Sequence, residues 1–103
     1  MISNFHYQDY ESLRTAEIKS WLPDYIPSSA INIKEKQNHD SGEFSATFEY
    51  ELKDAPQVEQ ICIKVFEHAD LTKYVCPTFE SRTNTLILGS NGQARFISHA
   101  TNI

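Results

Sequence analysis

The sequence predicts an α+β domain: a four-stranded antiparallel sheet made of two hairpins, with two helices, in the order α-β-β-α-β-β. One region in which apolar and polar residues alternate around a turn, and one in which apolar residues flank the turn signal GSNG, predict the hairpins. Apolar residues that recur every three to four positions predict the longer helix. Helices on one face of an antiparallel sheet then follow, because both apolar surfaces must be buried against each other.

The chain of 103 residues is long enough for one hydrophobic core, so we expect a single domain over residues 1–103. Residues 1–11 contain aromatic side chains without a clear period and are expected to be irregular. A short helix should begin at Ser12 or Thr15, because Ser12 is a residue type that caps helices. Pro23 should end it, since proline lacks the amide donor that a helix needs.

The first hairpin is predicted over residues 31–52. Ile31 and Ile33 alternate with polar residues, and the same alternation runs from Glu43 to Leu52. The intervening residues QNHDSG are of the types that tight turns select. His39 and Asp40 are therefore interpreted as turn residues and not as a catalytic pair or metal ligands.

A second helix is predicted from Asp54 to Phe66. Asp54 and Gln57 have the spacing of a capping box, and Pro56 lies in the first turn, where its missing donor costs little. The apolar residues at helical spacing are Val58, Ile61, Cys62, Val65 and Phe66. Residues 71–82 lose this period and contain Pro77, so they are expected to form a connector.

The second hairpin is predicted at the C-terminal end of the chain. Residues 86–88 are apolar and precede GSNG, in which Asn91-Gly92 is the strongest short turn signal in the sequence. Ala94, Phe96 and Ile97 follow it. These residues should supply the last two strands.

The charge of the chain limits its partners. It has 9 basic and 14 acidic residues and a net charge of −5, so it lacks the positive charge with which proteins hold nucleic acids or anionic membranes. No stretch approaches the roughly 20 apolar residues of a membrane span. A basic protein partner fits this charge, and the oligomeric state is left open.

The sequence predicts no catalytic, cofactor or metal site. The four histidines lie in four different segments, and the three glycines lie in predicted turns, not in a phosphate-binding loop. Cys62 and Cys76 do not have the spacing of a zinc site. They fit either two buried thiols or a single disulfide, and the residues alone leave both open.

Two groups of residues are candidate contacts for a partner or ligand. Glu43, Glu49 and Glu51 share the polar side of one predicted strand and would form an acidic stripe if that strand lay at a sheet edge. Trp21 and Tyr25 could stack on a ligand in a cleft beside the sheet. The first group indicates a basic protein partner, and the second indicates a small molecule.

One stretch resembles a known family. The residues of WLPDYIPSSAINI and of DSGE fit the pattern W-[IL]-P-x-[aromatic]-[LI]-P-x-S-A-x-x-I, followed by D-[TS]-[NG]-E. This pattern is similar to that of a family of small uncharacterised bacterial proteins, often membrane-anchored or lipoprotein-like. The chain departs from the pattern at Gln37, where the family has a histidine, which speaks against a metal or acid–base site there.

The resemblance implies a compartment. If an anchor precedes the matching region in the native protein, the domain faces the periplasm at the bacterial cell envelope, and a Cys62–Cys76 disulfide would form there. If Met1 is the native start, the protein is expected to be cytoplasmic.

The leading functional hypothesis is a non-enzymatic protein-binding domain, such as an immunity-type inhibitor of a toxin or an envelope-associated protein. The alternative is a small-molecule-binding protein or a small enzyme that uses the cleft near Trp21 and Tyr25. A purely structural envelope domain is the third hypothesis.

Overall fold

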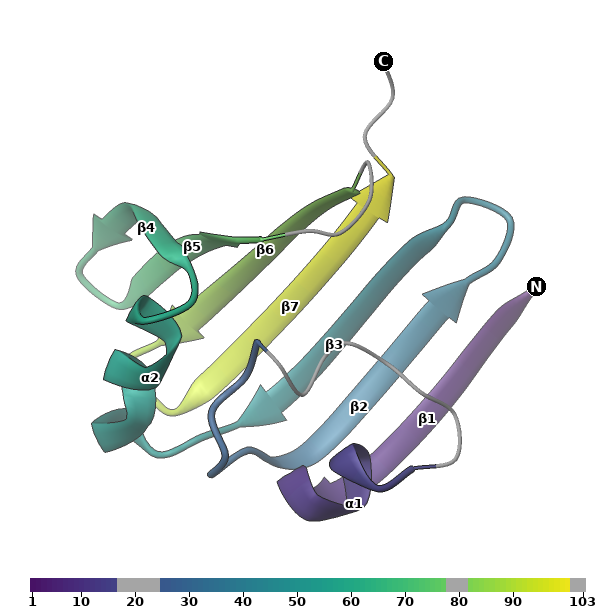
Figure 1. Ribbon diagram of the computed structural model, residues 1–103, viewed down its shortest axis with the longest axis horizontal. Helices are drawn as coiled ribbons and strands as arrows, with labels where there is room; N and C mark the ends of the chain where they lie inside the picture. The colour runs from purple at the N-terminus through teal and green to yellow at the C-terminus, as the bar shows by residue number, and fades with distance from the viewer. Residues whose placement is uncertain (17–24, 78–81, 101–103) are drawn as a thin grey trace.

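The computed structural model describes residues 1–16, 25–77 and 82–100, which form one seven-stranded antiparallel sheet with two short helices (Figure 1). In chain order the elements are β1 (Ile2–Asp9), α1 (Tyr10–Arg14), β2 (Ile31–Asn38), β3 (Glu43–Glu49), a 3-10 turn (Leu52–Asp54), α2 (Ala55–Glu59), β4 (Ile63–His68), β5 (Leu71–Cys76), β6 (Arg82–Gly89) and β7 (Gln93–Ala100). The strand order across the sheet is β1-β2-β3-β7-β6-β5-β4. The domain is mostly β, so the prediction of an α+β fold with four strands in the order α-β-β-α-β-β is wrong.

The first correction concerns the N-terminal segment. Residues 1–11 were expected to be irregular, but most of them form strand β1, which pairs with β2 at one edge of the sheet. Phe5 and Tyr7 are half-buried and His6 between them is exposed, and Tyr7 packs against the core. Helix α1 begins after Asp9, whose carboxylate accepts a hydrogen bond from the Ser12 amide at 2.8 Å. The helix already ends at Arg14, with Thr15 as its C-cap, so the predicted start at Ser12 or Thr15 is wrong. Pro23, which was predicted to end it, lies outside the described residues.

The first hairpin is confirmed. The Asn38 side-chain oxygen accepts hydrogen bonds from the amides of Asp40 and Ser41, and Gly42 has a φ of 73°, which glycine adopts without strain. A β-bulge interrupts β2, where Asn32 has a φ of 50°. The bulge places Ile31 on the opposite face from the core residue Ile33.

The second correction concerns the predicted helix over 54–66. Helix α2 ends at Glu59, and the chain enters strand β4 at Ile63. The predicted connector over 71–82 instead begins with strand β5. The physical cause is that the β-branched residues Ile63 and Val65 favour an extended backbone, which β5 then pairs with.

The second predicted hairpin is confirmed as β6 and β7. The Asn91 side chain accepts a hydrogen bond from the Gln93 amide at 3.1 Å, and Gly92 has a φ of 83°. A side chain at Gly89 would collide with Asn91, because a Cβ there would lie 2.7 Å from its side-chain oxygen. The conformation of this turn therefore depends on Gly89, Asn91 and Gly92.

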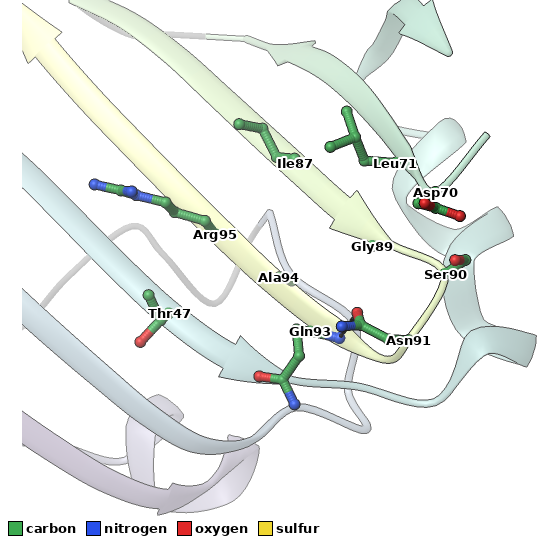
Figure 2. A pocket seen from close by; sticks show the side chains of 10 residues that line it. All are labelled: Thr47, Asp70, Leu71, Ile87, Gly89, Ser90, Asn91, Gln93, Ala94 and Arg95. Atoms are coloured by element: carbon green, nitrogen blue, oxygen red, sulfur yellow. Dashed lines mark hydrogen bonds between the residues drawn. The ribbon is translucent and has the colours of Figure 1, made fainter. Parts of the chain in front are cut away.

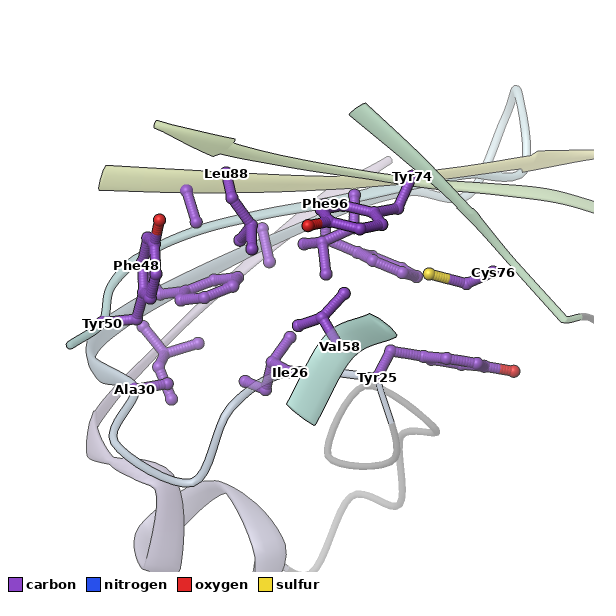
Figure 3. Packing of buried hydrophobic residues seen from close by; sticks show 14 of the residues in the cluster. Tyr25, Ile26, Ala30, Phe48, Tyr50, Val58, Tyr74, Cys76, Leu88 and Phe96 are labelled. Atoms are coloured by element: carbon purple, nitrogen blue, oxygen red, sulfur yellow. The ribbon is translucent and has the colours of Figure 1, made fainter. Parts of the chain in front are cut away.

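The hydrophobic core lies against one face of the sheet, which we call the covered face (Figure 3). Residues 25–30 and helix α2 lie over this face, and Ile26 and Val58 point from them toward the strands. Phe96, at the centre of β7, is fully buried and packs against the rings of Tyr25 and Phe44. The core thus closes only one side of the sheet.

Candidate functional site

The opposite face of the sheet, which we call the open face, is the candidate functional site. Its side chains are identified by the strand register, because residues directly opposite each other on neighbouring antiparallel strands share a face. Two rows of such residues cross its centre. One row is Ile63, Val75, Thr85, Ile97, Ser45, Lys36 and Asn4; the other is Phe66, Lys73, Ile87, Arg95, Thr47, Lys34 and His6.

The strand β4 side of the open face is apolar. Ile63 is 72 % exposed and Phe66 is 51 % exposed, and Val75 on the neighbouring strand β5 is also exposed. Ile87 on β6 and Ile97 on β7 continue the apolar surface toward the middle of the sheet and are half-buried. The solvent-exposed face of an antiparallel sheet usually carries polar residues. A contiguous apolar surface on such a face is typical of an interaction site.

The charges in the two central rows are all positive. Lys73 and Arg95 lie beside Ile87, and Lys34 and Lys36 lie further along the rows on strand β2. Neither row contains a carboxylate, although the chain as a whole has a net charge of −5. The centre of the open face therefore combines apolar and cationic side chains, whereas the carboxylates of Glu43 and Glu49 lie at the two ends of strand β3.

The open face contains a hollow of about 590 Å³ where β5, β6, β7 and β3 lie side by side (Figure 2). Leu71 and Ile87 line its apolar side, and Arg95 and Thr47 line it toward the middle of the sheet. Asp70 adds the one carboxylate of its lining, at the turn between β4 and β5. The hollow can accept a protruding side chain of a partner.

The three predicted acidic contacts do not form a stripe. Strand β3 lies between β2 and β7, so it is not an edge strand, and Glu43 and Glu49 lie at its two ends. The Glu49 carboxylate accepts a hydrogen bond from the Asn32 side chain at 3.0 Å, and Glu51 lies outside the strand in an ion pair with Lys53. The predicted acidic stripe required an edge strand, and β3 is not at an edge of the sheet.

The predicted aromatic cleft is only partly described. Trp21 lies outside the described residues, and Tyr25 is 3 % exposed with its ring stacked on Phe96 at 5.7 Å between centroids. A hollow of about 360 Å³ lies beside Tyr25, and its lining includes Gln57 and Ile61. The lining residues of this hollow include no carboxylate, amine or imidazole, so they offer no acid–base group beyond the phenols of Tyr10 and Tyr25.

The cysteines are joined. Cys62, just before β4, and Cys76, at the end of β5, form a disulfide with a Cα–Cα distance of 4.3 Å. Both are buried, and the bond closes a loop that contains the β4–β5 hairpin. The disulfide therefore fixes the edge hairpin that carries much of the apolar open face.

The other polar groups of the predicted turn form surface contacts. The His39 imidazole lies 3.0 Å from the Ser3 hydroxyl, and the Asp40 carboxylate forms an ion pair with the N-terminal amine at 2.7 Å. Both contacts are exposed. In the part of the chain that the structure describes, no group of three metal-ligating side chains comes together, and no helix is long and apolar enough to cross a membrane.

Sequence reasoning missed one buried charged residue, Glu35. It lies on the covered face between Phe5 and Ala46, is 3 % exposed, and has one carboxylate oxygen without a hydrogen-bond partner among the described residues. Desolvation by burial raises the pKa of Glu35 to about 7. The signal that could have revealed it is its position two residues after Ile33, which places both on the same side of a strand.

Residues 2–49, from β1 to the end of β3, match a protein family described as the YbbD head domain. The match covers strands β1, β2 and β3, so this part of the chain is similar to a YbbD head domain. The chain shows no significant similarity to curated proteins or to solved structures. The sequence pattern and the membrane anchor of the family named above stay predictions.

Proposed function

We propose that this protein is a non-enzymatic protein-binding domain whose open face binds a partner with an apolar and acidic surface. The observation that carries this proposal is the composition of the two central rows: exposed and half-buried apolar side chains, four cations and no carboxylate. Protein interfaces combine an apolar centre with charges that select the partner. This partner differs from the basic protein expected from the sequence, because the cations and not the carboxylates lie beside the apolar residues.

A protein partner fits the open face better than a nucleic acid does. The cations are interspersed with aliphatic side chains, and Phe66 is the only Phe, Tyr or Trp in the two rows, so there is no series of rings on which bases could stack. An acidic protein surface with apolar residues of its own would satisfy both components.

Two more specific roles belong to this class. An immunity-type inhibitor would cover a toxin with this face, and an envelope-associated protein would hold another envelope component. The disulfide supports a location in an oxidising compartment, because such bonds rarely persist in a reducing cytosol. The bound partner would distinguish the two roles.

Site-specific photo-crosslinking in cells of the source organism tests the proposal. A photoreactive amino acid at Ile87, in the centre of the open face, should give one discrete crosslinked protein. The same amino acid at Gln60, an exposed residue that follows helix α2, should not. Charge reversal by Lys73→Glu with Arg95→Glu should reduce the crosslink at least about tenfold, because each cation would be replaced by a repelling charge.

The control is Lys53→Glu, which reverses one positive charge at an exposed residue outside the open face. It should leave the crosslink unchanged. An equal crosslink at Gln60, or no effect of reversing Lys73 and Arg95, would exclude the open face as the binding surface.

A further inference from the structure

Strand β4 forms one edge of the sheet, and its side chains are unusually apolar for an exposed edge. All six of its residues are exposed, including Val65 at 53 % and Phe66 at 51 %. Strand β5 pairs with one side of β4, and no described strand pairs with the other side. An edge of this kind can accept another strand, and natural proteins usually protect it with charges or a bulge.

The bulge in β4 gives the strand a symmetric pattern of faces. Ile63 and His68 lie on the open face opposite Val75 and Leu71, and Lys64 and Glu67 lie on the covered face opposite Tyr74 and Thr72. The register shifts between Lys64 and Phe66, so Phe66 lies on the open face as well. Side chains alternate between the two faces along a strand, so Val65, which follows Lys64 on the covered face, lies on the open face next to Phe66. The order from Ile63 to His68 is open, covered, open, open, covered, open.

We propose that β4 pairs in antiparallel orientation with β4 of a second copy of this chain. The two-fold axis would pass between Val65 and Phe66. Residues of the two copies would then pair as Ile63 with His68, Lys64 with Glu67, and Val65 with Phe66. Every pair lies on a single face, and Lys64 of each copy meets Glu67 of the other, which makes the edge complementary to itself in charge.

Neighbouring registers do not place paired residues on the same face, and they do not bring Lys64 of one copy opposite Glu67 of the other. Shifting the axis onto Val65 would place Lys64, on the covered face, opposite Phe66, on the open face. Shifting it onto Phe66 would place Lys64 opposite His68, which has the same mismatch. A bulge normally discourages edge pairing because it bends the strand, but a second copy has the same bend at the matching position.

The pairing would join the open faces of two copies into one surface. Ile63, Val65 and Phe66 of both copies would lie at its centre, where their apolar area is partly removed from water. The interface of six residues per copy is smaller than a standard protein interface, so we expect a dissociation constant in the micromolar to millimolar range. This dimer does not depend on the partner of the open face.

Charge exchange across the axis tests the register by sedimentation equilibrium over a dilution series. Lys64→Glu should raise the dimer dissociation constant at least about tenfold, because two attractive cross-strand pairs become repulsive. Glu67→Lys should do the same. A mixture of these two variants should form a heterodimer, because each cross-strand pair then joins a carboxylate of the first variant to an amine of the second. The double variant should dimerise like the parent protein.

The mixture separates the proposed register from effects within one copy. Lys64 also forms ion pairs with Glu59 and Glu67 of its own chain, and loss of these contacts would weaken each variant without favouring a heterodimer. Lys53→Glu serves as the control with the same charge change outside β4. A parent protein that stays monomeric at millimolar concentration, or variants that fail to associate when mixed, would overturn the proposal.

Discussion

Replacement of Glu35 by methionine should stabilise the protein at high pH and have little effect at low pH. Glu35 is 3 % exposed on the covered face, where burial raises the pKa of its carboxyl from 4.5 to about 7. Methionine has a similar length and no charge, so it removes the titration with little change in volume.

The sign and size of the effect follow from proton linkage. Between pH 4.5 and about 7 the folded protein holds a proton on Glu35 that the unfolded chain has released, so stability falls as pH rises through this range. Each unit of pKa corresponds to about 1.4 kcal/mol, so ionisation of Glu35 should cost the folded state up to about 3 kcal/mol. The cost is absent below the unfolded pKa and complete above the folded one.

Urea denaturation at a series of pH values measures this dependence. We expect Glu35→Met to exceed the parent protein by about 2–3 kcal/mol in the free energy of unfolding at about pH 8, and by less than about 1 kcal/mol at about pH 5. Glu43→Gln is the matched control, because Glu43 is an exposed carboxylate on the neighbouring strand. A difference between Glu35→Met and the parent that stays constant with pH would refute the reasoning.

Three further predictions concern the disulfide, the core and a turn. Replacing both Cys62 and Cys76 by alanine should lower the free energy of unfolding by about 3 kcal/mol, as expected for a closed loop of this size, and dithiothreitol should then no longer shift the urea midpoint. Phe96→Ala should cost about 3–5 kcal/mol in urea unfolding, whereas Phe66→Ala, at an exposed site, should cost less than about 1 kcal/mol; equal costs would contradict the observed burial. Ala69→Gly should raise the thermal midpoint by a stabilisation of about 0.5–1 kcal/mol, because Ala69 has a φ of 35°, and an unchanged or lower midpoint would speak against strain there.

The two hairpins could be predicted from the sequence because their turns depend on local chemistry. Asn38 and Asn91 each accept hydrogen bonds from amides two or three residues later, and Gly42 and Gly92 adopt positive φ angles. These interactions need no residue distant in sequence. The alternating residues beside each turn therefore indicated the correct pairing.

Strand β4 could not be predicted because the apolar residues in and before it have the spacing of a helix. Val58, Ile61, Cys62 and Val65 recur at helical spacing, but helix α2 ends at Glu59 and the chain continues as an extended strand. Pairing with β5 and the disulfide to Cys76 favour the extended form. Both are contacts made within the folded protein, which a local window of sequence does not contain.

The open face was missed for a different reason. Alternation along a strand shows that its two faces differ, but it does not show which strands become neighbours. Lys73, Ile87 and Arg95 lie on three strands and meet only through the strand order β7-β6-β5. The cationic and apolar character of the centre is therefore a property of the sheet and not of any one segment.

The polar side chains on the two faces of the sheet have different surroundings. On the covered side, Arg82 donates to the Gly42 carbonyl and to Ser98, and the Asn84 side chain donates to the Pro77 carbonyl, so these two side chains link separate segments of the fold. On the open side, Lys73 lies among apolar residues, and its cross-strand neighbours are Phe66 and Ile87. Such a cation keeps the apolar surface soluble and discourages indiscriminate association, while it favours a partner that supplies the opposite charge. The proposed binding function therefore predicts that Lys73 selects among partners, whereas the apolar residues beside it supply area that contact with a partner would bury.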